Sequence, residues 1–300
     1  MRQRLLVFML FLATSYAWAQ GSDKTVFVKK IAQEIHLDGE LSEAFWQEAN
    51  YADKFWQLFP TDSIKSINNT RVKLVYNDTH LFIGIEAQAI DENFIVSSLR
   101  RDFSARTNDN VTFLFDTFRD GQNAFLFGVS AYGVQREGLI SERGASINGF
   151  SLTWDTKWQS ECVRLKDRFI IEIAIPFSSI KYPEGSRRWG FQSYRYDLQS
   201  NERSIWTQVD QNQIPINIGY YGTLVFEKPL AASKTPVYFI PYVNGIISND
   251  FSGNPNVEKV SAGGDLKIPI GNSLNLDVTL NPDFSNVEVD DIITNLTRFE

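Results

Sequence analysis

Cysteine and histidine are scarce in this chain of 300 residues, and their scarcity removes whole classes of chemistry. Cys162 is the single cysteine, so no disulfide can form within the chain. Its place beside Val163 on a predicted strand favours buried packing over a reactive thiol. His36 and His80 are the two histidines, which leaves almost no basis for a histidine-built zinc site or a Ser-His-Asp triad.

Basic residues are outnumbered, and they form no cluster. Lys and Arg number 29 against 36 Asp and Glu. An acidic chain without a basic patch does not hold a phosphate backbone by counterion release. We therefore expect no nucleic-acid partner.

Residues 1–19 have the pattern of a secretory signal peptide. Arg2 and Arg4 precede the apolar run Leu5–Ala13, and Ala17–Ala19 forms an A-x-A cleavage site. The apolar run is too short to cross a bilayer as a helix. The pattern predicts an exported protein.

Aromatic residues, in contrast, are plentiful, and many lie in residues 108–133. Two runs in this stretch alternate with a period of two, carried by Val111, Phe113, Phe115, Phe125, Phe127 and Val129. Such alternation predicts strands, and the intervening Asp120–Gly121 pair predicts a reversing turn. We expect this central ribbon, a hairpin, to lie in the middle of a sandwich.

Further strands are predicted on both sides of the central ribbon, at residues 25–31, 71–76, 81–89, 158–165, 169–175, 189–196 and 222–226. A helical turn ends near Ala49 and carries Trp46, which we interpret as a core plug. A Gly- and Ser-rich loop is expected over residues 138–151. The predicted fold class is all-β, an antiparallel β-sandwich over residues 20–229.

A linker-like stretch at residues 230–236 is followed by a different pattern in residues 237–300. Strands are predicted at residues 237–248, 259–270 and 273–280. In the last of these, leucine and valine alternate with polar residues, as in a transmembrane β-barrel strand. A second small soluble β-domain fits the pattern equally well. Because a closed barrel needs at least about eight strands, we expect the chain to be the first part of a longer polypeptide.

Several motifs in order, IHLDGELSEAFW, TRVKLVYNDTHLFIGIEA, the central ribbon, FIIEIAIPFSSI and WGFQSYRY, resemble the family 9 carbohydrate-binding module over Ile35–Phe226. The resemblance implies a β-sandwich with a polysaccharide or oligosaccharide partner and a link to polysaccharide breakdown. The tail, Ser273–Glu300, resembles the opening of an uncharacterised outer-membrane β-barrel family. That resemblance implies the envelope of a Gram-negative bacterium, in the outer membrane, periplasm or cell surface.

The resemblance also shows where the sugar site departs from the family pattern. Sugar-binding members place one stacking tryptophan shortly before the strand that corresponds to residues 111–116, and another before the closing strand. Those places hold Arg106 and, approximately, Pro215 here, and an arginine of the family falls near Gly128. Neither Arg106 nor Pro215 offers a flat ring to a pyranose.

The candidate ligand-binding residues are therefore Arg106 and the aromatics able to replace the missing pair, namely Trp56, Trp154, Trp158, Tyr196 and Trp206. Tryptophan is highly buried on average, so a core role competes with stacking at each position. Arg136 and Arg143 are further candidates for bonds to hydroxyl or uronate groups, against a simple surface role.

Hydrolysis and metal binding have weaker signals. A glycosidase needs two carboxylates in one cleft, and the available residues are Glu86, Asp116, Glu142 and Glu172. Glu172 lies in an apolar run, where it acts either as an acid with a raised pKa or as a structural carboxylate. No catalytic residue is assigned. Structural calcium, which such modules often hold, would use turns such as residues 108–110 or Asp116 with Asp120; no other cofactor is expected.

Three functions follow from these observations. The leading hypothesis is a carbohydrate-binding accessory domain of an exported cell-envelope protein. The alternative is a non-sugar interaction or plug module of an outer-membrane barrel. The third is a glycoside hydrolase acting on O-glycosyl bonds.

Overall fold

The computed structural model describes residues 24–33, 35–232, 237–248, 257–270 and 274–282. The predicted signal peptide lies outside these residues, as do residues 233–236 of the predicted linker. The chain divides into two compact units between Lys234 and Thr235, and each unit is described by itself. Among the described residues, no helix has both the length and the apolar character needed to cross a bilayer.

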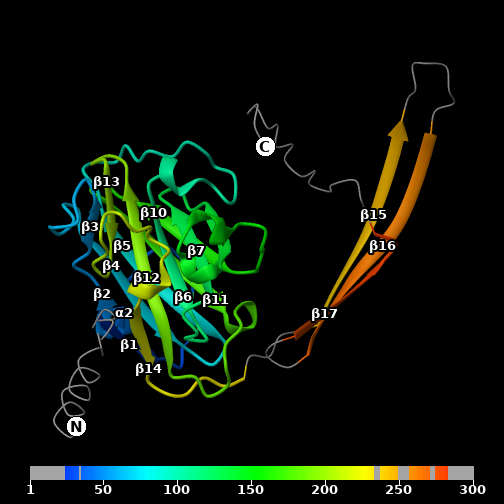
Figure 1. Cartoon of the computed structure of the whole chain (residues 1–300), viewed down its shortest axis with the longest axis horizontal. Coiled ribbons are helices and arrows are strands. Elements are labelled where there is room, and N and C mark those ends of the chain that lie inside the picture. Colours follow the sequence, from blue (N-terminus) through cyan, green and yellow to red (C-terminus); the bar gives the residue numbers. More distant parts are fainter. Residues whose placement is uncertain (1–23, 34, 233–236, 249–256, 271–273, 283–300) are drawn as a thin grey trace, which may run out of the picture. The chain divides into compact units, whose positions relative to one another are not determined.

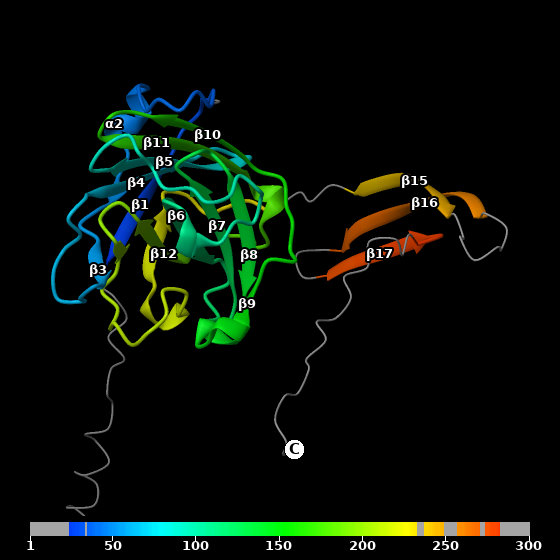
Figure 2. The same cartoon turned by 90° about the horizontal axis from the view of Figure 1, so that it is seen from above.

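Fourteen strands of the first unit join into one sheet that folds into two facing layers (Figures 1 and 2). One layer has the order β10-β11-β5-β4, with β2 also paired to β4. Its strands are β10 (Gln159–Arg164), β11 (Arg168–Pro176), β5 (His80–Gln88), β4 (Thr70–Tyr76) and β2 (Tyr51–Ala52).

The second layer has the order β14-β12-β6-β7-β8-β9, and β13 and β3 extend it from β12. Its strands are β14 (Gly222–Phe226), β12 (Arg188–Asp197), β6 (Asn110–Asp116), β7 (Ala124–Ser130), β8 (Gln135–Ile140), β9 (Phe150–Ser151), β13 (Glu202–Ile205) and β3 (Trp56–Phe59). The predicted all-β sandwich is confirmed.

Strand β1 (Thr25–Lys30) connects the two layers and differs from the predicted antiparallel pattern. Its first residues pair in parallel with β14, Thr25 opposite Thr223, and its last residues pair in parallel with β4, Lys29 opposite Val75. Every other described strand pair is antiparallel. The parallel pairing was not predicted because it joins opposite ends of the module.

The core lies between the layers and is centred on the predicted central ribbon. Phe113, Phe115 and Phe127 are fully buried there. Strand β6 pairs with β12 on one side and with β7 on the other, which places the ribbon in mid-sheet as predicted.

Besides the two-residue strands β2 and β9, three short strands occur where loops or no strand were predicted. Strand β8 extends into the predicted loop of residues 138–151, while β3 and β13 carry few alternating apolar residues. Polar side chains of these strands are buried and bonded, for example Gln57 to Glu202 (2.6 Å). A hydrophobic period therefore does not mark them.

Trp46, on the short helix α2 (Ala44–Glu48), is fully buried, which confirms its role as a core plug. Its indole Nε1 donates to Glu172 Oε1 at 3.0 Å, and the backbone N–H groups of Asp38 and Gly39 donate to Glu172 Oε2. Burial raises the pKa of Glu172. These three donors make it a structural carboxylate.

The second unit is a three-stranded antiparallel sheet in the order β15-β16-β17. Its strands are β15 (Tyr238–Ser248), β16 (Val257–Ile270) and β17 (Leu274–Leu280). The strand register and the alternation of side chains place on one face Phe239, Pro241, Val243, Gly245, Val260, Ala262, Gly264, Leu266, Ile268, Leu276, Val278 and Leu280. This set, which we call the apolar face, contains no polar or charged side chain.

Candidate functional site

The outer face of the second layer, which points away from the core, carries a second apolar cluster. We define this outer face by Leu114 on β6, Leu126 on β7, and Tyr194 and Tyr196 on β12. Residues of the loop 206–221 join the cluster, including Ile216, Ile218 and Tyr221. The loop therefore covers the middle of the outer face.

A second loop closes against the first. Gly144 has a φ of +60°, and a Cβ atom built there would lie 2.2 Å from the carbonyl oxygen of Ile216. Only glycine permits this approach without a shift of the backbone. The contact closes the middle of the outer face.

At one end of the outer face an open pocket of about 310 Å³ remains, which we call the Arg106 pocket. It is lined by Phe59, Arg106, Tyr196, Leu198, Asn201, Glu202 and Arg203. Arg106 comes from the 3-10 helix η1 (Ala105–Thr107), which directly precedes β6. Tyr196 pairs with Arg203 across β12 and β13, and Arg203 pairs with Phe59 on β3. The pocket thus collects residues from segments far apart in sequence.

The lining of the Arg106 pocket combines aromatic, cationic and hydrogen-bonding groups. The Arg203 guanidinium carbon lies 5.0 Å from the centre of the Phe59 ring. Glu202 Oε2 accepts hydrogen bonds from Gln57 Nε2 (2.6 Å) and from the Ile67 N–H (3.1 Å). Burial raises the pKa of Glu202. Such a mixture of apolar surface and a few fixed polar groups is typical of small-ligand sites.

A buried ionic network fixes the end of β12 beside the pocket. Arg195 is 1% exposed, and its Nη2 lies 3.2 Å from Asp197 Oδ2. Asp109 accepts hydrogen bonds from the backbone N–H groups of Ile95 and Leu198, both at 2.6 Å. These contacts hold Leu198, a lining residue, against the start of β6.

All three positions that the family resemblance singles out lie around the outer face. Arg106 lines the open pocket, Pro215 precedes the clustered Ile216, and Gly128 pairs with Arg136 on β8. A Cβ atom at Gly128 would lie 2.8 Å from Thr112 Oγ1, so a side chain there would displace its neighbour.

Because Gly128 on β7 has no side chain, the nearest arginine to the family's arginine position is its pairing partner Arg136 on β8. Arg136 is 6% exposed, its guanidinium carbon lies 4.9 Å from the Phe150 ring centre, and its Nε and Nη1 atoms have no hydrogen-bond partner. Arg143, in contrast, is exposed in the 3-10 helix η2 (Glu142–Gly144) and lines no described pocket.

Two of the predicted tryptophans belong to the core. Trp158 is 6% exposed and donates from Nε1 to Glu137 Oε2 at 3.3 Å, and Trp206 is 3% exposed. Stacking on a sugar would require their rings to be uncovered.

The other two tryptophans are half-buried. Trp154 packs against Phe125, with ring centres 5.1 Å apart, and Lys65 Nζ lies 3.2 Å from the centre of the Trp56 ring. Neither tryptophan lines the Arg106 pocket, whereas the predicted residues Arg106 and Tyr196 meet there. Phe59 and Arg203 were missed by the sequence analysis because their own segments carry no local signal for a site.

The residues considered for calcium are engaged with the protein itself. Both carboxylate oxygens of Asp109 accept backbone N–H groups, and Asp116 accepts those of Asp120 and Gly121. Among the described residues, no three His, Cys, Asp or Glu side chains gather as a metal ion would require. The donor set at these turns does not fit a calcium site.

Comparison with known proteins agrees with this architecture. Residues 37–228 match the family described as carbohydrate family 9 binding domain-like. A candidate carbohydrate-binding protein from Bacteroides uniformis shares the fold with a TM-score of 0.55 at 11% identity, covering 68% of this chain and 99% of that one. A search of curated proteins gave no match.

Two structures of a family 9 carbohydrate-binding module from Caldicellulosiruptor kristjanssonii are also similar. The complex with glucose has a TM-score of 0.49 at 15% identity, covering 68% of this chain and 96% of that one. The complex with cellotriose has a TM-score of 0.46 at 16% identity, covering 70% and 96%.

The fold and the family match define the class of the first unit, a β-sandwich of the binding-module type. The chain belongs to the carbohydrate family 9 binding domain-like family. Residues 234–300 match a separate domain of unknown function (DUF5916).

Proposed function

We propose that the first unit binds a polysaccharide or oligosaccharide through the Arg106 pocket. The observation that carries the proposal is that position 106, where sugar-binding members of the resembled family stack a tryptophan, lines an open pocket of about 310 Å³. Phe59, which is half-buried, supplies aromatic surface in the same pocket, and the buried Tyr196 forms part of its wall. Arg106, Asn201 and Arg203 supply hydrogen-bond donors for sugar hydroxyl groups.

In this pocket one aromatic ring and a set of arginine hydrogen-bond donors take the place of the family's two stacking tryptophans. The pocket offers an aromatic ring, Phe59, already backed by Arg203, and an exposed guanidinium at Arg106. A sugar placed there would exchange bonds to water for charge-assisted bonds, which are stronger than neutral ones. Membership of the carbohydrate family 9 binding domain-like family supports the proposal.

Calorimetric titration of the chain with cellotriose and with xylan fragments tests the proposal. We expect binding, and we expect the double variant Arg106→Ala, Arg203→Ala to bind at least about tenfold more weakly, since two hydrogen bonds to a charged donor are lost. The matched control is Arg100→Ala with Arg143→Ala, which removes the same charge from exposed positions outside the pocket. No heat with any saccharide, or equal losses in the two double variants, would refute the proposal.

A non-sugar interaction module is the second candidate, and one observation favours it. Loop 206–221, which contains Pro215 at the position of one of the family's stacking tryptophans, closes against Gly144 over the middle of the outer face. Binding of a protein segment without any response to saccharides would support it. No comparable observation favours a hydrolase: Glu172 is fully buried, and its carboxylate accepts three hydrogen bonds from the protein itself.

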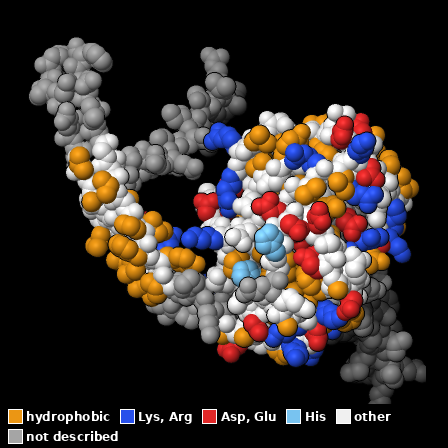
Figure 3. Space-filling model, turned by 180° about the vertical axis from the view of Figure 1, so that it is seen from behind, with side chains coloured by type: hydrophobic (Ala, Val, Ile, Leu, Met, Phe, Trp, Pro, Cys, Tyr) orange, Lys and Arg blue, Asp and Glu red, His pale blue; other side chains and the backbone are white. Residues whose placement is uncertain are grey.

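We also propose that the protein is exported to the envelope of a Gram-negative bacterium and that residues 237–300 contribute outer-membrane β-barrel strands. The apolar face supports this, and Figure 3 shows hydrophobic side chains gathered along the three-stranded sheet. Phe239, Val243 and Val260 on this face are 67%, 77% and 80% exposed. The opposite face carries Asp265 and Asp277. One lipid-compatible and one polar face is the pattern of a barrel strand.

Flotation with lipid vesicles tests the membrane proposal. Val278→Arg, on the apolar face, is expected to lower the lipid-bound fraction strongly, because arginine on a lipid face costs about 2–4 kcal/mol near the bilayer midplane. Thr279→Arg places the same charge on the opposite face of the same strand and should change the fraction little. Equal behaviour of the two variants would contradict a lipid-facing sheet.

A further inference from the structure

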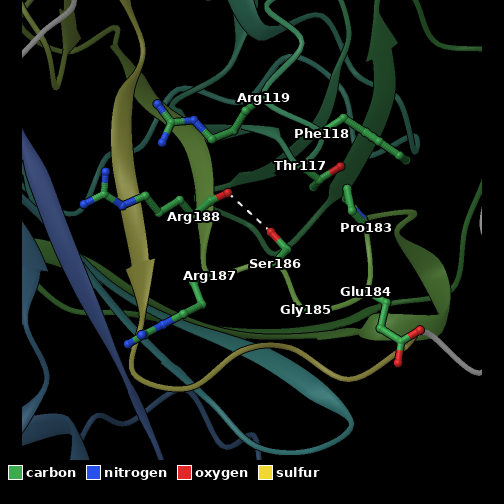
Figure 4. Close-up of a pocket in the computed structure, with 9 residues that line it drawn as sticks. All are labelled: Thr117, Phe118, Arg119, Pro183, Glu184, Gly185, Ser186, Arg187 and Arg188. Atoms are coloured by element: carbon green, nitrogen blue, oxygen red, sulfur yellow. Dashed lines mark hydrogen bonds between the residues drawn. The ribbon is translucent and has the colours of Figure 1, made fainter.

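A second pocket, of about 420 Å³, lies at a turn end of the first unit (Figure 4). It is formed by the segment after β6 and the segment that leads into β12, and it is lined by Thr117, Phe118, Arg119, Pro183, Glu184, Gly185, Ser186, Arg187 and Arg188. We call it the Arg188 pocket. Its volume lies within the range of small-ligand sites.

Three arginines line this pocket, and none of them is paired with a carboxylate of the described residues. In the part of the chain that the structure describes, Arg119, Arg187 and Arg188 form no ion pair. Arg187 Nη2 donates to the carbonyl oxygen of Glu227 at 2.9 Å, so it is positioned without being neutralised. Glu184 is the single acidic residue of the lining. A pocket with three positive charges and one negative charge is unusual in a chain whose net charge is −7.

The two walls of the pocket differ in character. Figure 4 shows the three arginine side chains on one side of Ser186, with Phe118, Pro183 and Glu184 on the other. Phe118 is 42% exposed, which leaves apolar surface opposite the cationic wall. The arginines on this wall lack a carboxylate partner within the described structure, and guanidinium groups suit carboxylate or sulfate oxygens. A ligand that carries an anionic group next to an apolar ring surface could bind the arginines on one side and contact Phe118 on the other.

The Arg188 pocket and the Arg106 pocket lie on the same face of one strand. Trp189 and Phe191 of β12 point into the core, so Arg188 and Tyr196 both point to the outer face by alternation. Each of these two residues lines one pocket. At about 3.3 Å per residue the two positions are about 26 Å apart along β12. A single polymer chain somewhat longer than this could reach both ends by passing over loop 206–221.

We infer that the Arg188 pocket is a second, anion-selective subsite, and that the ligand of this protein is an acidic polysaccharide carrying carboxylate or sulfate groups. The inference rests on the proposed carbohydrate binding and narrows its substrate class. The guanidinium groups of Arg119 and Arg188 contact the anionic oxygens, while the Arg106 pocket holds a neutral part of the chain.

Titration of the full chain with three probes tests the inference: oligogalacturonate for carboxylate, dextran sulfate for sulfate, and cellotriose as the neutral reference. We expect at least one acidic probe to bind more tightly than cellotriose. The double variant Arg119→Gln, Arg188→Gln should weaken that binding at least about tenfold and leave cellotriose unaffected. Binding of the acidic probe should also weaken towards ~1 M salt, where the Debye length falls to about 3 Å.

The matched control is the double variant Arg100→Gln, Arg143→Gln, which removes two exposed arginines outside both pockets. Equal weakening in the two double variants would mean attraction by overall charge and would overturn the inference. Cellotriose binding with no preference for either acidic probe would overturn it while leaving the proposed function intact. No binding of any probe would overturn both. Preference for one acidic probe identifies the anionic group.

Discussion

Replacing Arg195 by methionine is expected to lower the free energy of unfolding by about 3–5 kcal/mol, the usual cost of removing one partner from a buried ion pair. Asp197, 2% exposed, would then keep its charge without Arg195 Nη2, now 3.2 Å away. The hydroxyl of Thr70, 3.2 Å from Arg195 Nη1, would lose a hydrogen-bond donor as well. Methionine fills much of the same space, so the loss reflects charge and hydrogen bonding more than a cavity.

Urea denaturation monitored by tryptophan fluorescence measures this effect. Arg100→Met is the control, because Arg100 is exposed and the same substitution there should change the midpoint little. Adding Asp197→Asn to Arg195→Met should recover part of the loss, since the uncompensated charge is removed. A loss below about 1 kcal/mol for Arg195→Met, as for exposed pairs, would show that the pair is not desolvated.

Phe115→Ala should cost a similar amount, about 3–5 kcal/mol, because it opens a cavity in the middle of the core. Phe115 is fully buried, and its ring centre lies 5.5 Å from that of Phe191, 6.1 Å from that of Trp189 and 6.2 Å from that of Phe127. These neighbours come from both β7 and β12, so the side chain joins three adjacent strands. A site that rigid strands hold on several sides collapses little around a cavity.

The same denaturation experiment checks the prediction, with Leu99→Ala as the control. Leu99 is 70% exposed, and its loss should lie within about 0.5 kcal/mol of the parent protein. Phe115→Leu should fall between the two, because most of the apolar volume is kept. A small effect of Phe115→Ala would place the central ribbon outside the stabilising core.

Strands whose buried residues are apolar and alternate regularly could be predicted from the sequence, whereas strands with buried polar residues could not. The central ribbon was predicted because Phe113 and Phe115 alternate with Thr112 and Leu114 in a regular period. Strand β13 was missed because Glu202, Arg203 and Ser204 are polar, although Glu202 and Ser204 are buried at 2% exposure each. Their burial depends on partners elsewhere in the chain, which a local period does not report.

The lining of the Arg106 pocket, our candidate site, was predictable only in part for the same reason. Arg106 and Tyr196 were selected from resemblance and aromatic character, and both line the Arg106 pocket. Phe59 and Arg203 enter it through the pairing of β3 with β13, and no local pattern predicts that pairing. The Arg188 pocket likewise depends on two turns that meet only in the folded protein.

The parallel pairing of β1 carries a consequence for biosynthesis. Thr25 leaves the ribosome among the first residues of the module, yet its partner Thr223 is among the last. Until β14 has been synthesised, one edge of β1 has no pairing partner, and β1 cannot link the two layers. Such distant contacts slow folding, because a long loop must close before they form. The nascent module therefore stays incomplete until its last strand has been synthesised.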